Sequence, residues 1–562
     1  MEKRIIECVP NFSEGRNKAV IQQITSAIEA VDGVKLLDVD PGEATNRTVV
    51  TFVGEPEAVL EAAFQGVKKA AEVIDMRNHK GAHPRMGATD VCPLIPIAGI
   101  TLEECAELAR QLAKRIADEL HVPTYCYEAA AFTPERRNLA VCRAGEYEAL
   151  PEKMNHEGKA PDFGDRPFDE GVARTGATAV GARDFLIAVN YNLNTTSTRR
   201  ANAIAFDVRE KGRPVREGNS PVGKPLKDEN GKTIMKPGTL KATKAIGWFI
   251  DEYQIAQVSM NITNISVTPL HVAFDEVCRA ANARGVRVTG TEIVGLIPKR
   301  TLIEAGRYFL KKQERSTGIS EEEIIRIAIK SMGLDELKPF KPEEKVIEYL
   351  IEADNKKKKL VDLTCTGFAE ETASESPAPG GGSISAYMGA LGAALGTMVA
   401  NLSSHKPGWD ARWEEFSDWA DKGQKLMTEL LHLVDEDTEA FNRIMNVFSM
   451  PKGTDEEKAA RSAALQEATL YATQVPLRTM QVFEIVKAMA EQGNPNSVTD
   501  AGVGALAARS AVLGACLNVK INAAGLKDRA VADDLIGQAN RIVADAEKAE
   551  REILEIVESK IK

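Results

Sequence analysis

Hydrophobic positions in the first third of the chain follow two alternating patterns. Short apolar runs with the spacing of strands are separated by longer stretches with the 3.6-residue period of helices. The predicted order is strand, helix, strand, strand, helix, strand, helix, on residues 5–9, 17–31, 34–40, 48–53, 56–73, 91–97 and 102–120. The first third of the chain therefore predicts a βαββαβ unit followed by a further helix.

A second series of elements repeats this order without repeating the residues themselves. Its predicted strands and helices fall on residues 185–192, 197–211, 245–251, 255–262, 270–284 and 286–294. The order is typical of ferredoxin-like units, so the pattern predicts two such subdomains, 1–184 and 185–350. Residues 213–244 interrupt the second unit, and the turn signal Asn230-Gly231 predicts a surface hairpin there.

The pattern changes to long amphipathic helices in the last third of the chain. Candidate helices cover residues 410–433, 437–450, 455–490, 500–524 and 530–559. A polar segment with four consecutive lysines marks residues 351–361 as a linker. We therefore expect an α/β region followed by a separate all-α bundle over residues 362–562.

Composition and charge limit the class of protein. The chain has 562 residues, 43% hydrophobic and 27% charged, with a net charge of -11. These values are typical of a soluble globular protein, and the acidic balance argues against nucleic-acid binding. Because no apolar run approaches the ~20 residues of a membrane span and the N-terminus lacks a signal pattern, we expect a cytoplasmic protein with no membrane partner.

No metal site is expected from the sequence. The eight cysteines are scattered without CxxC spacing, so a zinc ribbon or redox dithiol is not indicated. They are expected to be reduced residues of the core. His79 and His83 would share a helix face at this spacing, but Gly81 and Pro84 make a helix unfavourable.

The same histidine segment is a candidate for proton transfer. His83 is flanked by Lys80 and Arg85, which suits acid/base chemistry beside an anionic substrate. Asp38 and Asp40 end a predicted strand, where a carboxylate can orient an imidazole. Strand alternation places both aspartates on one face, so the pattern leaves both as candidates.

A glycine-rich run precedes the first long helix of the C-terminal region. Gly380, Gly381 and Gly382 follow two prolines, and Ser383 leads into a helical pattern over 385–402. A glycine turn at a helix N-terminus can cradle an anion or another ligand. The run is not a phosphate loop of the Walker type, because no Lys-Ser/Thr pair follows. The alternative is a tight turn before a buried helix.

Two further polar features interrupt the helical pattern. Asp435 and Glu439 would share a helix face, whereas Asp437 points elsewhere. This acidic run is otherwise explained by a solvated face or by a helix N-cap. Asn518 and Asn522 recur four residues apart among apolar residues and suggest a polar site.

The motifs of the first 350 residues resemble the glutamate formimidoyltransferase family. They are ECVPNFSEG at 7–15, LDVD at 37–40, HPRMG at 83–87, RAGEYEALP at 143–151 and GARDFLIA at 181–188. The resemblance implies that His83 is the catalytic base and that Asp40 is its partner. It also implies folate binding by the stretch from Gly164 through Phe168 to Gly176.

Residues 362–562 resemble the cyclodeaminase/cyclohydrolase family. The resemblance lies in the glycine run, in the acidic run and in residues 493–500. It implies that Asp437 is the catalytic acid and that Gly380, Gly381, Gly382 and Ser383 form a folate-site loop. The order of the two regions is that of the formimidoyltransferase-cyclodeaminase family.

The resemblance implies a bifunctional enzyme of histidine degradation. A formimino group passes from N-formimino-L-glutamate to tetrahydrofolate, and the product is then cyclised to 5,10-methenyl-tetrahydrofolate with release of ammonia. Tetrahydrofolate, which can carry a polyglutamate tail, is the co-substrate, and no metal is required. A homo-oligomer is implied, with helical dimers assembled as a tetramer of dimers. Two alternatives remain: a methenyl-tetrahydrofolate cyclohydrolase as the second domain, or a non-catalytic folate-binding scaffold.

Overall fold

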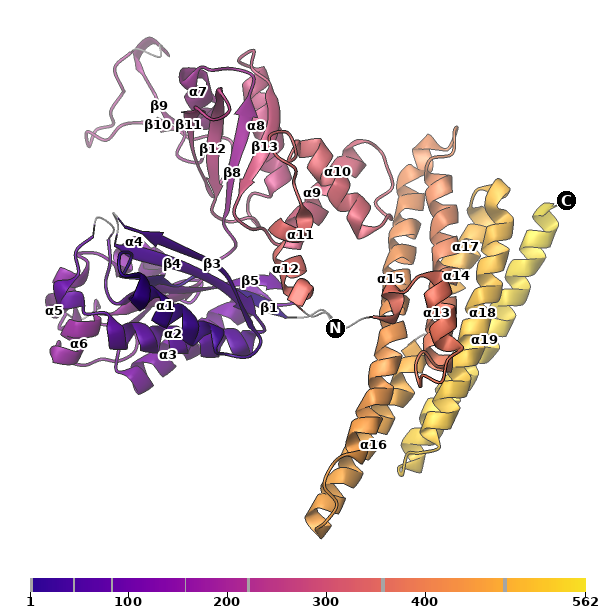
Figure 1. The fold of residues 1–562 in the computed structure, drawn as a ribbon. Helices are drawn as coiled ribbons and strands as arrows, with labels where there is room; N and C mark the ends of the chain where they lie inside the picture. Colours follow the sequence, from indigo (N-terminus) through magenta and orange to yellow (C-terminus); the bar gives the residue numbers. More distant parts are fainter. Residues whose placement is uncertain are drawn as a thin grey trace. The chain divides into compact units, whose positions relative to one another are not determined.

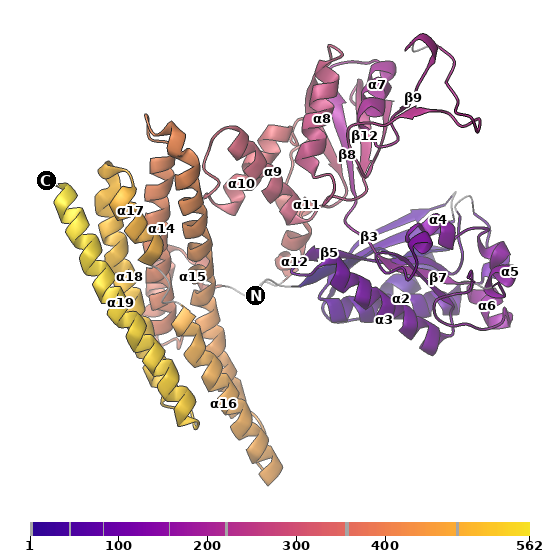
Figure 2. The same ribbon diagram turned by 180° about the vertical axis from the view of Figure 1, so that it is seen from behind.

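The chain forms one mixed α/β unit and one helical unit (Figures 1 and 2). The computed structural model describes residues 4–43, 46–81, 84–156, 158–219, 223–354, 359–478 and 483–561. The α/β unit comprises Met1–Thr301 and Met332–Asn355, and the helical unit comprises Leu302–Ser331 and Lys356–Lys562. The predicted change from α/β to all-α structure along the chain is therefore confirmed.

The first sheet has seven strands in the described residues. They are β1 (Ile5–Cys8), β2 (Asn11–Phe12), β3 (Val34–Gly42), β4 (Arg47–Gly54), β5 (Thr89–Ala98), β6 (Thr124–Glu128) and β7 (Thr178–Ala182). The spatial order is β3, β4, then β1 with β2, then β5, β7 and β6. β1 and β2 both lie between β4 and β5 and are separated at Pro10, which has no N–H to continue the ladder. Only the β5–β7 and β6–β7 pairs are parallel among these strands.

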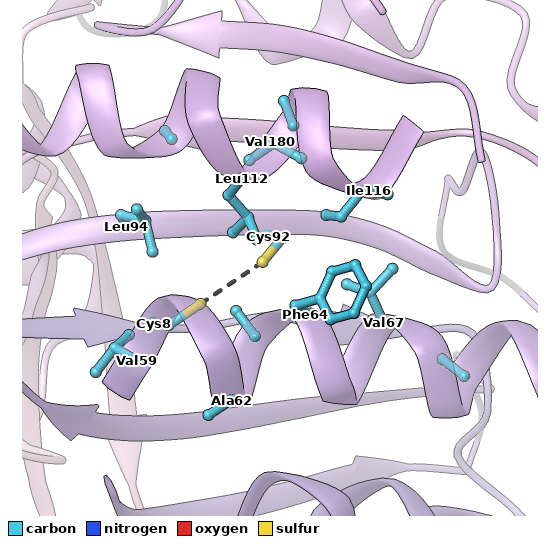
Figure 3. Close-up of a cluster of buried hydrophobic side chains, with 14 of the residues drawn as sticks. Cys8, Val59, Ala62, Phe64, Val67, Cys92, Leu94, Leu112, Ile116 and Val180 are labelled. Atoms are coloured by element: carbon cyan, nitrogen blue, oxygen red, sulfur yellow. Dashed lines mark hydrogen bonds between the residues drawn. The ribbon is translucent and has the colours of Figure 1, made fainter. Parts of the chain in front are cut away.

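One face of this sheet is covered by three helices: α1 (Lys18–Glu29), α2 (Pro56–Val73) and α3 (Leu102–Leu120). Their apolar sides pack on alternate strand residues, and Figure 3 shows part of this core. Cys8 and Cys92 meet there with their sulfur atoms 3.6 Å apart. All eight cysteines are free thiols and most are buried, as expected for core residues.

The opposite face of the first sheet carries the polar residues of interest. Its β5–β7–β6 part packs against the short helices α4 (Leu139–Cys142) and α5 (Leu150–Met154). A further helix, α6 (Glu170–Thr175), precedes β7. Over β3 and β4 the face is more open, since Asp38 and Asp40 are exposed. The topology therefore leaves one end of this face accessible to a substrate.

The second sheet is a four-stranded antiparallel sheet in the order β11, β12, β8, β13. Its strands are β8 (Ile187–Leu193), β11 (Thr243–Ile250), β12 (Ile255–Ile262) and β13 (Val288–Val294), with helices α7 (Thr198–Val208) and α8 (Leu270–Asn282). The predicted hairpin is present as β9 (Arg213–Pro214) paired with β10 (Met235–Lys236). Two short helices, α11 (Pro342–Lys345) and α12 (Ile347–Asp354), complete this unit.

Long helices build the second unit. They are α13 (Cys365–Thr372), α14 (Gly381–Ser404), α15 (Trp413–Phe448), α16 (Asp455–Arg478), α17 (Phe483–Gln492), α18 (Val498–Ala523) and α19 (Arg529–Ile561). The prediction of separate helices over 410–433 and 437–450 was wrong, because α15 is continuous through the acidic run. Asp435 and Asp437 are therefore mid-helix residues, not N-caps.

Small residues allow the central helices of the bundle to approach closely. A Cβ atom at Gly392 of α14 would lie 3.0 Å from the Gly504 carbonyl oxygen of α18. By length and composition, Gly381–Ser404 and Pro495–Ala523 could each cross a membrane. In this bundle 61% and 50% of their most apolar windows are buried, as in core helices of a bundle.

Residues 302–331, which the sequence assigned to the second subdomain, pack with the helical bundle. They contain most of α9 (Lys299–Lys312) and α10 (Glu321–Met332). In the connection between them, the Thr317 hydroxyl donates to Asp421 at 2.6 Å and the Thr317 amide donates to the Ser417 hydroxyl at 3.0 Å. Asn401 donates to the Gly318 carbonyl at 2.8 Å. These contacts attach the segment to α14 and α15.

Candidate active sites

The loop that precedes β5 is held by polar contacts on both sides of the candidate base. His83 itself lies outside the described residues. Before it, the Asn46 amide donates to the Lys80 carbonyl at 3.1 Å. After it, the Met86 amide donates to Asp90 at 3.0 Å, and the Ser13 hydroxyl donates to the Gly87 carbonyl at 2.7 Å. The chain on either side of His83 is thus fixed to the sheet.

His79 has a structural role in this loop. Its Nδ1 accepts a hydrogen bond from Arg85 Nε at 3.3 Å, because a guanidinium can only donate. Its Nε2 lies 2.9 Å from the Asn46 carbonyl oxygen, which can only accept. Both ring nitrogens are therefore engaged, with the proton on Nε2. This arrangement leaves His83, not His79, as the candidate base.

Arg85 connects the loop to the predicted folate stretch. It forms ion pairs with Glu146 at 3.1 Å and Glu148 at 2.6 Å, and these interactions raise its pKa. The guanidinium also lies 6.0 Å from the centre of the Tyr147 ring. Tyr147 in turn packs edge-on against Phe168 at 6.4 Å. The structure thus brings Phe168 close to the segment that follows His83.

The two glycines of this stretch are explained by backbone geometry. Gly164 and Gly176 both have positive φ, at 76° and 66°. A Cβ atom at Gly176 would lie 2.2 Å from the Met86 carbonyl oxygen, beside the loop, whereas Gly164 lies against Pro123 and Ala117. Folate contact by Gly164, Phe168 and Gly176 stays a prediction.

Side chains of alternating charge, Asp40, Arg47, Asp90 and Arg143, extend from the open sheet face toward the loop. Burial lowers the pKa of Arg47, and the carboxylates of Asp90 and Asp40 oppose this effect. Arg143 pairs with the buried Asp90, whose pKa is raised by burial despite that partner. Of the two strand-end aspartates, Asp40 is therefore the one whose charge acts on Arg47. Asp38 lies two residues earlier in β3, opposite Thr51 of β4 in the strand register.

Sequence reasoning missed one buried acid on the same face. Glu7 of β1 is 5% exposed, and burial raises its pKa to about 7 although Arg183 opposes the shift. The available signal was an acidic residue in an otherwise apolar strand. A carboxyl group that titrates near neutral pH could exchange a proton with a bound ligand.

The second candidate site lies where α14 begins beside the middle of α15. The Ser383 hydroxyl donates to Asp437 at 3.0 Å, and the Ser383 backbone amide donates to it as well. Burial raises the pKa of Asp437 while both Ser383 bonds oppose the shift. A Cβ atom at Gly382 would lie 2.1 Å from an Asp437 carboxylate oxygen, so glycine is required for this close approach.

The neighbouring acids of α15 have other partners. Asp435 accepts the Leu360 amide at 2.6 Å and so holds the segment that leads into the bundle. Glu436 accepts from the Tyr471 hydroxyl and from Arg478, both at 2.7 Å. Burial acts to raise the pKa of Glu436, but these two partners outweigh it and the pKa is lowered. Asp437 is therefore the acid that faces the glycine run.

The two asparagines of α18 separate into different roles. A Cβ atom at Gly381 would lie 3.4 Å from the Asn518 amide nitrogen, so Asn518 lies beside the glycine run. Asn522 instead donates to the Ala472 carbonyl at 2.7 Å and links α18 to α16. In the described part of the chain, no group of three or more His, Cys, Asp and Glu residues is arranged to hold a metal ion.

Comparisons with known proteins cover both units. Residues 5–183 match the formiminotransferase domain, N-terminal subdomain, and residues 188–352 match the formiminotransferase domain. Residues 364–541 match formiminotransferase-cyclodeaminase.

Three relatives show how the similarity is distributed. Formimidoyltransferase-cyclodeaminase of Gallus gallus is 40% identical over 561 residues, 99% of each chain. Glutamate formimidoyltransferase of Streptococcus pyogenes serotype M1 is 42% identical over 311 residues, 55% of this chain and 95% of that protein. Methenyltetrahydrofolate cyclohydrolase of Methylorubrum extorquens is 39% identical over 202 residues, 35% of this chain and 97% of that protein. The chain thus belongs to the formimidoyltransferase-cyclodeaminase family.

Proposed function

We propose that this chain is a bifunctional folate enzyme, a glutamate formimidoyltransferase joined to a formimidoyltetrahydrofolate cyclodeaminase, which is an ammonia lyase. The observation that carries the proposal is similarity to a bifunctional relative over 99% of both chains. The motif residues of each half support it: the anchored loop in the first unit and the Asp437–Ser383 pair in the second. We place the two reactions in histidine degradation.

The first unit would perform the transfer. N5 of tetrahydrofolate attacks the formimino carbon of N-formimino-L-glutamate and loses a proton as the bond forms. His83 would take that proton and return it to the glutamate nitrogen as this group leaves. Asp40, next to Arg47 at the open end of the sheet face, would assist the imidazole, and nearby cations would bind the substrate carboxylates.

The second unit would perform the cyclisation. N10 of 5-formimino-tetrahydrofolate attacks the formimino carbon and gives up its proton to the Asp437 carboxylate, and the amine leaves as ammonia once it is protonated. Asp437 would supply that proton, since its raised pKa keeps the carboxyl protonated at a higher pH than an exposed aspartate. The backbone N–H groups of Gly381 and Gly382 begin α14 at the same point, which supports the prediction of a folate-site loop there.

The finer fold and domain assignments belong to the same proposal. The strand order β13, β8, β12, β11, with α7 and α8 as the crossing helices, supports a ferredoxin-like second subdomain. The order of β3, β4, β1 with β2, and β5 supports the same motif in the first subdomain. The three matched ranges support domains at 1–184, 185–350 and 362–562, with a linker at 351–361.

A coupled assay tests the proposed function. Purified chain with N-formimino-L-glutamate and tetrahydrofolate is expected to form methenyl-tetrahydrofolate and ammonia in equal amounts. His83→Ala is expected to abolish both products from these substrates while ammonia release from supplied 5-formimino-tetrahydrofolate continues. His79→Ala is the matched control, and its transfer rate should fall far less. Near-normal transfer by His83→Ala would exclude this residue as the base.

Cyclohydrolase activity is a second candidate function for the helical unit. It is favoured by the 39% identity to a methenyltetrahydrofolate cyclohydrolase. The full chain should be supplied separately with 5-formimino-tetrahydrofolate and with 5,10-methenyl-tetrahydrofolate. Hydrolysis of the second compound without ammonia release from the first would replace cyclodeaminase by cyclohydrolase. Tight folate binding without either reaction would indicate a scaffold.

We propose a cytoplasmic homo-oligomer built from dimers of the helical unit, assembled as a tetramer of dimers. Exposed apolar side chains on neighbouring helices α14 and α18 support the dimer: Leu391, Met398, Leu402, Val503, Leu506, Leu517 and Ile521. Leu517 and Ile521 are 68% and 71% exposed, which is costly for large apolar groups. Sedimentation of Leu517→Asp/Ile521→Asp should show a smaller particle, and an unchanged mass would contradict this interface.

A further inference from the structure

A cavity of about 460 Å³ lies at the β6 edge of the first sheet. Its buried floor is formed by Tyr125, Cys142 and Lys153, with Arg136 half-buried beside them. The exposed rim carries charged groups of both signs, Lys159, Glu135 and Glu152, together with His156, and apolar Val141, Ala144 and Ala149 form part of the wall. The volume is within the range of small-molecule sites.

Lys153 is a buried cation that has no counter-ion among the described residues. It is 7% exposed, and lysines are rarely buried unless they are paired. In the described residues its ammonium donates only to the Cys142 carbonyl oxygen, and no carboxylate pairs with it. Burial lowers its pKa, and Arg136 and Lys159 act in the same direction. Among the described residues, the buried Lys153 ammonium therefore lacks a carboxylate partner.

The Tyr125 hydroxyl is also unsatisfied. It is buried, and within the described part of the chain it has no hydrogen-bond partner. The Lys153 ammonium lies 4.8 Å from the centre of the Tyr125 ring. Arg136, by contrast, is satisfied by an ion pair with Asp162 at 2.6 Å and by the Ala160 carbonyl. The cavity floor thus holds one donor without an acceptor, the Tyr125 hydroxyl, and one cation without a carboxylate partner, Lys153, and both are unfavourable in a buried site.

We propose that this cavity binds a small organic carboxylate. One carboxylate oxygen accepts from the Lys153 ammonium and the other accepts from the Tyr125 hydroxyl, so that Lys153 gains a carboxylate partner and Tyr125 gains an acceptor. The organic part lies along Val141, Ala144 and Ala149 toward the rim. A carboxylate is favoured over a bare inorganic anion because this wall is apolar.

The site is separate from the proposed transfer site but adjoins it through the chain. Cys142, whose carbonyl accepts from Lys153, is followed by Arg143, which pairs with Asp90. Asp90 accepts the amide of Met86, three residues after His83. A ligand that draws Lys153 away from Cys142 would therefore act on the segment that carries Arg143.

Calorimetric titration of the full chain tests the site with three probes: glutarate, benzoate and inorganic phosphate. We expect saturable binding of at least one of the two carboxylates. Lys153→Met should remove the binding that depends on this cavity, and Tyr125→Phe should weaken it about tenfold through loss of one hydrogen bond to a charged group. Binding that is lost in Lys153→Met is assigned to this cavity, and binding that remains is assigned to the transfer site.

Lys114→Met is the matched control, because Lys114 is an exposed lysine paired with Asp118 on α3. Its binding should equal that of the unaltered chain. Equal carboxylate affinity in the unaltered chain and Lys153→Met would overturn the proposal. So would binding of phosphate alone, or of none of the probes. Tyr125→Phe retains the ring and the packing, so it provides the test if Lys153→Met does not fold.

Discussion

The two candidate active sites position their chemical groups in different ways. In the α/β unit, the loop around His83 is tied to the sheet by contacts from distant parts of the chain, including Asn46 and Asp90. In the helical unit, Asp437 stands on a rigid helix and meets Ser383 where a glycine leaves room for it. The first site depends on a polar network and the second on close packing, so they should fail under different substitutions.

The largest effect should come from removing the proposed acid of the helical unit. Asp437→Asn keeps the size of the side chain and an oxygen for Ser383, but it cannot donate and recover a proton in the same way. We expect ammonia release to fall by about a hundredfold to ten-thousandfold, the usual contribution of general acid/base catalysis. Formimino transfer should stay unchanged, and both rates are measured with separately supplied substrates.

Asp435→Asn is the control for that substitution. Asp435 lies two residues away, and an asparagine oxygen can still accept the Leu360 amide. Ammonia release should therefore change by no more than a few-fold. Equal losses in the two variants would show that the acidic run acts as a whole and would remove the distinction drawn between its faces.

The pH dependence of its free energy of unfolding should distinguish the α/β unit from the helical unit. The folded pKa of Glu7, about 7, lies above its ordinary value of 4.5. Its stabilising contribution is therefore complete below pH 4.5 and is lost as the pH rises through 7. The loss is on the order of 3 kcal/mol. Glu7→Gln should remove this dependence, as measured by hydrogen exchange in β1 and β5 between pH 5 and pH 8.

Glu7 and Asp437 both have pKa values raised by burial, but they lie in different units, so the pH test of Glu7 reports on the α/β unit. If exchange in β1 and β5 is equally protected at pH 5 and pH 8 in the unaltered chain, Glu7 does not hold its proton in the folded state. Exchange in α15 of Glu7→Gln serves as an internal reference, since this helix belongs to the other unit and should be unaffected.

Close packing in the helical unit can be tested by adding a single carbon atom. Gly382→Ala would place a Cβ atom 2.1 Å from the Asp437 carboxylate and must displace it. We expect ammonia release to fall about tenfold to a hundredfold, because small displacements of a catalytic group are costly. Gly537→Ala on α19 is the control, since its Cβ atom would meet only Arg541 Nη1, at 3.6 Å. Similar rates in both variants would contradict the packing argument.

The sequence predicted the order of the α/β elements and the family, but not which of several similar residues meet in space. The acidic run resembled the start of a helix. The structure instead has one continuous helix, α15, which packs against α14 and α16. Helical spacing placed Asp435 and Asp437 on different faces but could not show which of these faces meets the glycine run. The attachment of Thr317 to Ser417 and Asp421 joins residues a hundred positions apart, and no local signal predicts such a contact.

The same limit applies to the charged residues of the first sheet. Glu7 and Asp90 were not singled out from the sequence, because their partners Arg183 and Arg143 lie far along the chain and no local pattern indicates them. The four-residue spacing of His79 and His83 did not show that His79 has a structural role. The two hydrogen bonds of its ring assign that role. Motifs thus indicate which residue types matter, while long-range contacts decide what each one does.

The smallest predicted effect decides what Ser383 does. The sequence suggested folate binding, whereas its hydroxyl donates to Asp437. Ser383→Ala removes a bond that holds the pKa of Asp437 down, so this pKa should rise further. The limb of the pH–rate profile for ammonia release that reports Asp437 should move to higher pH, although the backbone amide still donates and opposes the shift. If the profile stays in place while KM for 5-formimino-tetrahydrofolate rises, Ser383 contacts the folate, and the helical site depends on ligand contacts as well as on packing.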